Sequence, residues 1–314
     1  MQNFTAHKDL KKRLSDSVKA GKLGHAYIFE GPEGVGKLST ALWFAKIAFC
    51  EKGGCGVCEN CLKVRHGTHP DIHIIDEAFI SANKGTSMSA KGQKEIKPGS
   101  VHSSRMAREF VYKKPFFAKR SFIIFPEEFP LNPAGQNAIL KAFEEPPEYC
   151  TIIIICKTAS SLLDTIRSRA VICRFSPLEE FEIKEYLSFR YPGSEDISFL
   201  CEGLMGKADE LISSPSLMEE HRKIISAFEN FIFSDGDMTG IVPLFDKDTA
   251  EDTIKLIECS VISKAKDCSD DEKALFYARI TEILENAQLR LKKNINFNLC
   301  ITDMLIKCWE ATHG

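Results

Sequence analysis

A glycine-rich turn between an apolar strand and a helix limits the fold more than any other feature of this sequence. Residues 31–37 read GPEGVGK, preceded by the predicted strand AYIFE and followed by the predicted helix KLSTALWFAKIAF. In such a loop Gly31, Gly34 and Gly36 let backbone N–H groups surround a phosphate, and Lys37 reaches the terminal phosphates of a nucleotide. We therefore expect a nucleotide-phosphate site here. A glycine-rich turn with a solvated lysine is the alternative.

The remaining strand signals indicate a parallel α/β sheet. Apolar, Ile-rich runs occupy residues 72–76, 121–125, 151–156 and 170–175, as is typical of strands covered on both faces. After Pro177 the pattern becomes helical, and Ser176 suits the start of the first helix.

These patterns predict three domains. We expect a P-loop-type α/β domain at 1–176, a small helical lid at 177–214 and a C-terminal helical bundle at 215–314. The Gly-, Ser- and Lys-rich segment 81–100 is interpreted as an exposed loop within the first domain.

Charge and apolar content restrict the location and the partners of the protein. The 41 Lys and Arg residues against 44 Asp and Glu give a net charge of −3, which supplies no general basic field for a long nucleic-acid track. The sequence contains no apolar run long enough for a membrane span, and its N-terminus lacks the pattern of a secretory signal. A cytoplasmic protein with no membrane partner is expected.

The predicted nucleotide site lacks both of its usual magnesium ligands. The residue after the lysine is Leu38 instead of Ser or Thr, and Ser39 is rotated by about 100° on the helix. Pro126 follows the strand at 121–125, where an Asp is expected, and Glu127 occupies the place of the catalytic acid. These two losses argue against hydrolysis. The alternative is a strand that ends one residue later, with a glutamate as ligand.

Four of the twelve cysteines form a cluster that is typical of a structural zinc site. The proposed ligands are Cys50, Cys55, Cys58 and Cys61. Gly53, Gly54 and Gly56 permit the sharp turns that tetrahedral ligation requires. Four thiolates would fill the coordination sphere, so catalysis by the metal is not expected.

Other interpretations of the cysteine cluster stay open on the sequence. Cys55 and Cys58 could form a redox pair, or the thiols could be buried on a helix face. His66 and His69 are close enough in sequence to replace one cysteine ligand. The eight scattered cysteines are interpreted as buried, reduced thiols in apolar surroundings, which suits a reducing compartment.

A basic and aromatic stretch, YKKPFFAKR at 112–120, has two interpretations. Aromatic side chains between cations are typical of nucleic-acid contact. The favoured interpretation is a helix end that leads into the strand at 121–125, because the apolar residues continue directly into that strand.

Together these motifs resemble the DNA polymerase III clamp-loader family of bacteria, within the AAA+ superfamily. The resemblance is carried by GHAYIFEGPEGVGK, CGVCENC, GTHPDIHIID, LNPAGQNAILKAFEEPPE and TIRSRA, in family order, and it covers residues 1–176. It implies an AAA+ fold, a structural zinc ion and an ATP site that can hold nucleotide without hydrolysis. It also implies a C-terminal collar that assembles a hetero-oligomer.

The resemblance also assigns roles to two basic residues. Arg169 matches the arginine that projects into the ATP site of a neighbouring subunit, although Ala170 replaces the family's cysteine. Lys207, in the segment GKADEL, matches a basic sensor residue of the lid. Without the resemblance, Arg169 would be expected to pair with a surface carboxylate and Lys207 to be a solvated helix lysine.

The function expected from the resemblance is that of a non-hydrolysing subunit of the DNA polymerase III holoenzyme. It would supply Arg169 in trans while the sliding clamp is loaded on primed DNA. Its partners would be the gamma/tau and delta loader subunits, the sliding clamp and, through the assembly, DNA. The alternatives are an active gamma/tau-type or other P-loop ATPase, and an ATP-binding scaffold that senses nucleotide.

Overall fold

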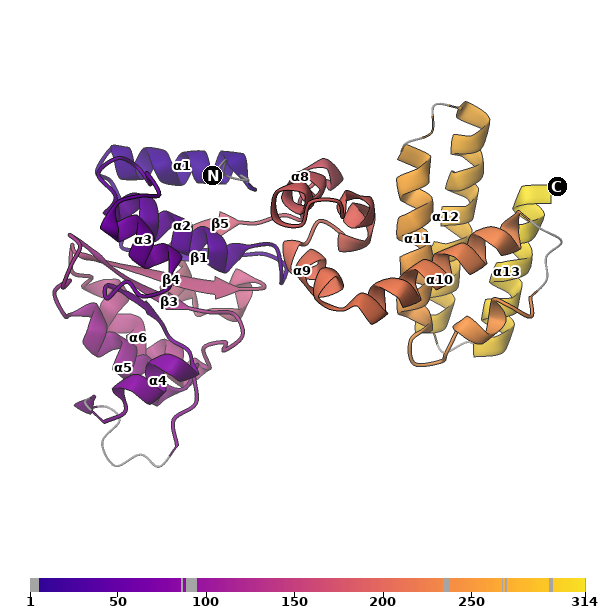
Figure 1. Ribbon diagram of the computed structural model, residues 1–314. Helices are drawn as coiled ribbons and strands as arrows, with labels where there is room; N and C mark the ends of the chain where they lie inside the picture. The colour runs from indigo at the N-terminus through magenta and orange to yellow at the C-terminus, as the bar shows by residue number, and fades with distance from the viewer. Residues whose placement is uncertain are drawn as a thin grey trace. The chain divides into compact units, whose positions relative to one another are not determined.

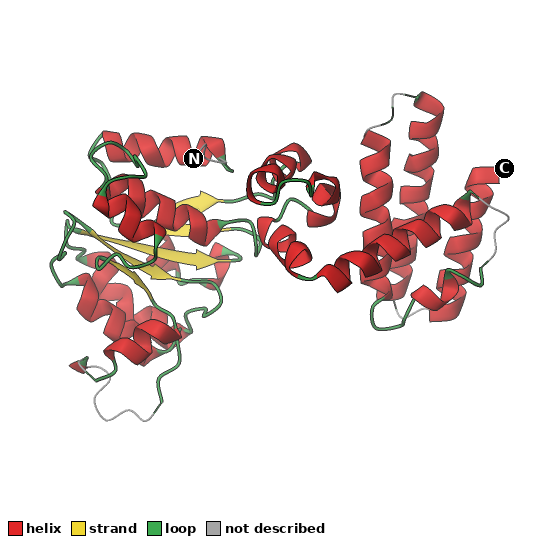
Figure 2. Ribbon diagram, in the orientation of Figure 1, coloured by secondary structure: helices red, strands yellow, loops and turns green. Residues whose placement is uncertain are grey.

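The computed structural model describes residues 6–85, 87–88, 95–233, 238–266, 268, 270–293 and 296–313. The chain divides into two units, Met1–Leu178 and Glu179–Gly314, which are shown in Figures 1 and 2. The first is an α/β domain and the second consists of helices. The α/β fold class with a helical C-terminal part is therefore confirmed.

A five-stranded parallel sheet forms the centre of the first unit. The strands are β1 (Ala26–Glu30), β2 (Ile72–Ile74), β3 (Ser121–Phe125), β4 (Cys150–Cys156) and β5 (Val171–Arg174). Their order in the sheet is β2-β3-β4-β1-β5. Because all the strands are parallel, the loop after β1 begins at the common carboxyl edge of the sheet, where ligands of open α/β sheets bind.

Helices cover both faces of this sheet, as Figure 1 shows. One face carries α1 (Lys8–Lys19), α2 (Lys37–Phe49) and α3 (Glu59–Arg65). The other carries α4 (Glu77–Asn83), α5 (Val101–Val111) and α6 (Pro133–Glu144). The 3₁₀ turn Ala159–Ser161 and the short α7 (Asp164–Arg167) connect β4 to β5. Double coverage explains why β3 and β4 are buried along their whole length.

The second unit contains helices of two sizes. Shorter elements come first: α8 (Glu180–Arg190), the 3₁₀ helix η3 (Glu195–Cys201) and α9 (Met205–Ser213). Longer helices follow: α10 (Pro215–Ile232), α11 (Ala250–Lys266), α12 (Asp271–Lys292) and α13 (Phe297–His313), with a 3₁₀ turn at Val242–Leu244. The long helices share one apolar core. The division of this unit into a lid and a bundle at residue 214 stays a prediction.

Two local predictions are wrong. The first helix of the second unit begins at Glu180, not near Ser176, because Leu178 is buried and the Glu182 carboxylate accepts a hydrogen bond from the Glu179 N–H at 3.1 Å. The segment 81–100 is not an exposed loop throughout, since its first three residues end α4 and Ile96 is buried. Residues 86 and 89–94 of that segment lie outside the described part.

The buried carboxylate of Asp71 holds the connection between α5 and β3. Asp71 is 2% exposed, and its oxygens accept hydrogen bonds from the backbone N–H groups of Phe116, Phe117 and Ala118 at 2.5, 2.8 and 2.6 Å. Three donors on one carboxylate satisfy a charge that would otherwise be costly to bury. Asp71 therefore fixes a loop more than forty residues away in sequence.

We expect Asp71→Asn to destabilise the first unit by about 3 kcal/mol, because the amide removes the charge and turns a donor toward N–H groups. Urea denaturation would measure this as a lower midpoint. Asp164→Asn is the matched control, since the Asp164 carboxylate is 87% exposed. Equal midpoints for the two variants would contradict the assignment.

Candidate nucleotide and metal sites

The loop between β1 and α2 has the backbone of a phosphate-binding turn. Gly31, Gly34 and Gly36 all have positive φ, at 155°, 76° and 93°, which L side chains rarely adopt. A Cβ at Gly31 would also lie only 2.4 Å from the Phe175 carbonyl oxygen. Gly36 immediately precedes α2, so the N-terminal N–H groups of that helix are available to an anion.

Lys37 points back onto its own loop instead of into solvent. Its side chain is 1% exposed, and Nζ donates to the carbonyl oxygens of Gly31 and Pro32 at 2.6 and 2.5 Å. Nζ also forms an ion pair with Glu127 Oε2 at 2.8 Å. The alternative of a solvated lysine is therefore wrong. In this conformation the charge that a phosphate would use is already neutralised by Glu127.

The structure keeps the predicted register at the magnesium-ligand positions. The strand β3 ends at Phe125, so Pro126 is the first residue beyond it and Glu127 the second. Leu38 follows Lys37 on α2, and Ser39 is exposed. A side chain of Leu or Pro offers no oxygen to a hard cation. The alternative register, with the strand one residue longer, is wrong.

Removal of the Glu127 charge is expected to strengthen nucleotide binding. Glu127→Gln removes the ion pair with Lys37 Nζ, and we expect the affinity for ATP to rise about tenfold, which corresponds to about 1.4 kcal/mol. Equilibrium dialysis with labelled ATP would measure it. Glu128→Gln is the control, because the neighbouring Glu128 is exposed. No gain in Glu127→Gln, or an equal gain in the control, would contradict the role of the ion pair.

Arg169 lies at the surface, between α7 and β5. Its guanidinium is held by Nη1 bonds to the Thr165 carbonyl oxygen at 3.1 Å and to Ser168 Oγ at 3.4 Å, and Nη2 lies 3.7 Å from Glu144 Oε1. The side chain is 39% exposed. Without the resemblance, Arg169 is expected to pair with a surface carboxylate, and Glu144 is such a carboxylate. The distance between them is at the long end for an ion pair. The group is oriented by its own turn and accessible from outside.

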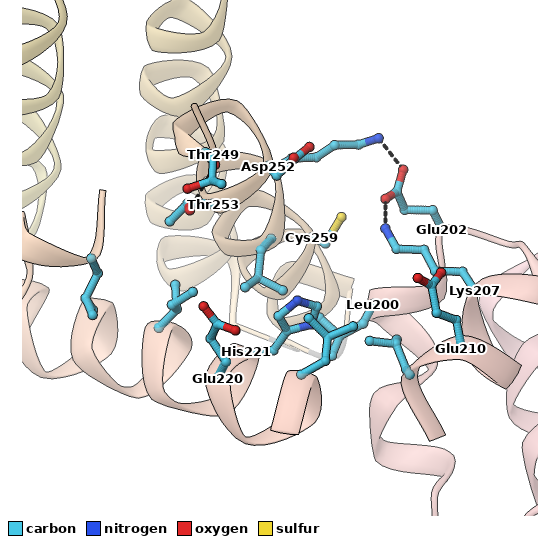
Figure 3. Close-up of a pocket in the computed structure, with 16 residues that line it drawn as sticks. Leu200, Glu202, Lys207, Glu210, Glu220, His221, Thr249, Asp252, Thr253 and Cys259 are labelled. Carbon is cyan, nitrogen blue, oxygen red and sulfur yellow. Dashed lines mark hydrogen bonds and ion pairs between the residues drawn. The ribbon is translucent and has the colours of Figure 1, made fainter. Parts of the chain in front are cut away.

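Lys207 belongs to an ion-pair network in the second unit. Its ammonium pairs with Glu202, which also pairs with Lys255 of α11; Figure 3 shows Glu202 between the two. Burial opposes ionisation of Glu202, but the two lysines outweigh it and lower the pKa of this carboxyl. The solvated-lysine alternative does not describe this paired side chain, and its role as a sensor stays a prediction.

The same residues line a cavity of about 500 Å³. Its walls combine leucines from η3, α9, α10 and α11 with the carboxylates of Glu210, Glu220 and Asp252. His221 also lines it, and burial lowers the pKa of this imidazole, which keeps it neutral. This cavity could not be predicted from local sequence patterns, because its wall comes from several different helices of the second unit.

The four cysteines of the cluster converge as predicted. Their Sγ atoms all lie within 4.8 Å of one another, and Cys58 Sγ is 3.7 Å from Cys50 Sγ. Sulfurs 2.3 Å from a tetrahedral zinc ion are about 3.8 Å apart. Gly53, Gly54 and Gly56 have positive φ, as the sharp turns require. The group therefore has the donors and the size for a zinc ion with four sulfur ligands.

Backbone N–H groups already favour thiolates at two of these cysteines. Burial raises the pKa of Cys50, but N–H groups of Cys55, Gly54 and Lys52 outweigh it and lower the pKa to about 6. The N–H groups of Val57 and Cys58 likewise lower the pKa of Cys55. Burial instead raises the pKa of Cys61 to about 12, which a bound cation would reverse.

The two histidines near the cluster do not join it. His69 Nε2 lies 3.0 Å from Asn60 Oδ1, and His69 Nδ1 accepts from the Asp71 N–H at 3.2 Å. The ring stacks on Phe49, so both nitrogens have partners away from the cysteines. His66 follows α3 and is exposed. Among the described residues, the four cysteines form the one group of this kind that could hold a metal ion.

Comparison with known proteins identifies the family. A family model described as "DNA polymerase III, delta subunit" matches residues 6–179. The chain belongs to this family. It is 30% identical over 224 residues to DNA polymerase III subunit delta' of Bacillus subtilis, an alignment that spans 69% of this chain and 63% of that protein.

Other relatives, which match a shorter part of the chain, are gamma/tau subunits. The chain is 32% identical over 160 residues to subunit gamma/tau of Mycobacterium tuberculosis, covering 50% of this chain and 25% of the relative. It is 30% identical over 178 residues to subunit tau of Escherichia coli, covering 55% and 25%. The chain therefore spans less than two thirds of the length of each relative. The clamp-loader resemblance is confirmed at the level of the family.

Within the described residues, helices long and apolar enough to cross a membrane do not occur.

Proposed function

We propose that the chain is a delta'-type subunit of the DNA polymerase III clamp loader that does not hydrolyse ATP itself. The first support is the nucleotide site, where Leu38 and Pro126 replace both oxygen ligands of magnesium. The GTHPD pentapeptide at 67–71 also resembles delta' more than gamma/tau. The delta' relative from Bacillus subtilis is consistent with this choice.

The observation that carries the proposal is the pairing of Lys37 with Glu127. In an active P-loop ATPase the lysine contacts the β- and γ-phosphates, and an acidic residue orients the attacking water. Here these two side chains neutralise each other at 2.8 Å. Hydrolysis would require both to separate and a metal ion to bind without its usual ligands.

In the proposed role, the first unit contributes Arg169 to the ATP site of a neighbouring gamma/tau-type subunit. A guanidinium supplied in trans stabilises charge on the transferred γ-phosphate and needs no chemistry at its own subunit's loop. Partners would also include the delta subunit, the sliding clamp and primed DNA, and the assembly would act in the cytoplasm. The helices of residues 215–314 would form the oligomerisation collar.

The proposal includes a structural zinc ion held by Cys50, Cys55, Cys58 and Cys61. The ion would fix the connection between α2 and α3, because Cys50 ends one helix and Cys61 lies in the other. With four thiolate ligands it leaves no open position for water, so its contribution is structural.

The decisive experiment is clamp- and DNA-stimulated ATP turnover by a loader reconstituted with this chain. Arg169→Ala should abolish stimulated turnover at the neighbouring site, and Lys37→Ala should change it little. A loader that depends on Lys37 and tolerates Arg169→Ala would instead establish an active gamma/tau-type ATPase.

A second candidate, an ATP-binding scaffold, is favoured by the loop backbone. Gly31, Gly34 and Gly36 keep the conformation of a phosphate cradle although the metal ligands are absent. Retention of ATP by the isolated chain without turnover would support this refinement, in which Lys207 would sense the bound nucleotide. An isolated chain that hydrolyses ATP would contradict both candidates.

A further inference from the structure

The connection between α5 and β3 presents aromatic side chains to solvent. Phe116 is 86% exposed, Tyr112 is 41% exposed and Phe117 is 39% exposed. The interpretation of this stretch as a helix end that leads into β3 is correct for the path of the backbone, because α5 ends at Val111 and β3 begins at Ser121. It is wrong for Phe116, which does not enter the core. A single exposed apolar side chain is ordinary at a protein surface, but here three exposed aromatic side chains lie within one short connection.

The loop holds Phe116 in this outward position. Asp71 receives the N–H groups of Phe116, Phe117 and Ala118, and Pro115 restricts the preceding backbone. The backbone is therefore fixed before any ligand arrives. A preorganised loop loses less conformational entropy on binding than a mobile one.

The charge of the loop is entirely positive. Residues 112–120 contain three lysines and an arginine and no acidic residue, although the whole chain has a net charge of −3. Arg120 is used internally, since Nη1 donates to the Cys150 carbonyl oxygen and Thr151 Oγ1. Lys113, Lys114 and Lys119 are exposed. Lys119 lies 3.7 Å from Glu51 Oε1, but both side chains are almost fully exposed and the pair is screened.

A further cation comes from the neighbouring helix. Lys63 of α3 lies with Nζ 3.8 Å from the centre of the Phe117 ring. Lys63 Nζ also pairs with Glu59 Oε1 at 3.0 Å, but the Glu59 side chain is 67% exposed, so solvent screens this pair. The cation–π contact orients the ring and extends the basic surface toward the segment that follows the cysteine cluster. Aromatic faces and ammonium groups thus alternate across two elements that lie next to each other.

We propose that this surface, formed by Lys63 and residues 112–119, binds single-stranded nucleic acid. Bases stack on exposed aromatic rings without regard to sequence, and the ammonium groups contact the phosphates. The charge favours this ligand over a protein, because protein interfaces are depleted of lysine. The site is separate from the phosphate loop and from Arg169, so it goes beyond the proposed ATPase role.

The test is fluorescence anisotropy of a labelled oligothymidylate with the whole 314-residue chain in zinc-containing buffer. We expect Phe116→Ala to weaken binding by about fivefold or more, the usual effect of one lost stacking contact. Lys114→Gln should weaken binding and also reduce the salt dependence, with a slope lowered by about 0.7 for one phosphate contact. Phe181→Ala and Lys223→Gln are matched controls, because both residues are exposed in the second unit.

Several outcomes would overturn this inference. Unchanged oligothymidylate binding by Phe116→Ala is one, and a loss of the same size in Phe181→Ala is another. If heparin displaces the labelled oligothymidylate as well as unlabelled oligothymidylate does, and Phe116→Ala has no effect, the binding depends on charge alone. Unchanged nucleic-acid binding with weaker assembly into the loader would show a protein contact instead. None of these results depends on ATP turnover, so the proposed function is tested separately.

Discussion

A loader reconstituted with the Arg169→Ala chain is expected to lose ATP hydrolysis at the neighbouring subunit's site by about 10³-fold or more. Arginine fingers supplied in trans contribute this much because they neutralise charge that develops on the γ-phosphate. Arg169 has the geometry for this role, since its own turn orients it through Thr165 and Ser168 and the side chain is 39% exposed. The rate of ATP hydrolysis by the reconstituted loader, measured in single-turnover conditions with clamp and DNA present, would test this expectation.

The long contact between Arg169 and Glu144 predicts that Arg169→Ala affects turnover but not stability. Nη2 lies 3.7 Å from Glu144 Oε1, and such a surface pair contributes little to stability. Arg169→Ala should therefore leave the thermal midpoint and the assembly of the loader unchanged. Arg169→Lys should also fail in turnover, because an ammonium lacks the planar fork of a guanidinium.

Two control variants separate the role of Arg169 in trans from a general effect of losing one positive charge. Arg105→Ala removes an exposed arginine on α5 and should leave turnover intact. Lys37→Ala tests the phosphate loop of this chain and should also leave the ATP turnover of the loader unchanged. If Arg169→Ala retains full turnover in an assembled loader, the trans role fails whatever Lys37→Ala does.

The phosphate loop shows how far sequence reasoning extends. The bounds of β1, α2 and β3 agree with the predicted segments, because continuous apolar runs and positive-φ glycines are local signals. The ion pair of Lys37 with Glu127 could not be predicted in this way. It depends on β3 ending near the loop that follows β1, and the two residues are ninety positions apart.

Phe116 and Ile96 show the same limit of sequence reasoning, the first for an exposed side chain and the second for a buried one. Phe116 belongs to an apolar run that leads into β3, yet it is 86% exposed because Asp71 holds the backbone from another element. Ile96 lies in a Gly-, Ser- and Lys-rich segment, yet it is buried in the core of the first unit. Composition indicates the average environment of a segment, whereas long-range hydrogen bonds and packing decide individual side chains.

Removal of zinc is expected to have the largest effect on stability. Structural zinc sites contribute about 10–16 kcal/mol of binding free energy, comparable to the whole stability of a typical domain. Only part of this would be lost here, because the sheet core does not include the cluster. We expect Cys58→Ser to lower the free energy of unfolding of the first unit by at least about 3 kcal/mol, and its thermal midpoint by about 6–12 °C.

Elemental analysis and calorimetry together test this expectation. The unmutated chain should hold a single zinc ion, and Cys58→Ser should hold much less. The prediction that the scattered cysteines are buried is wrong for Cys259 and Cys268, which are partly exposed. Cys268→Ser is therefore the matched control, because Cys268 is partly exposed like Cys58 but lies in the second unit. EDTA should lower the midpoint of the unmutated chain to that of Cys58→Ser and leave the variant unchanged, since both treatments remove the same ion. An additional fall in the variant, or equal zinc contents, would show that the four thiols do not act together as a metal site.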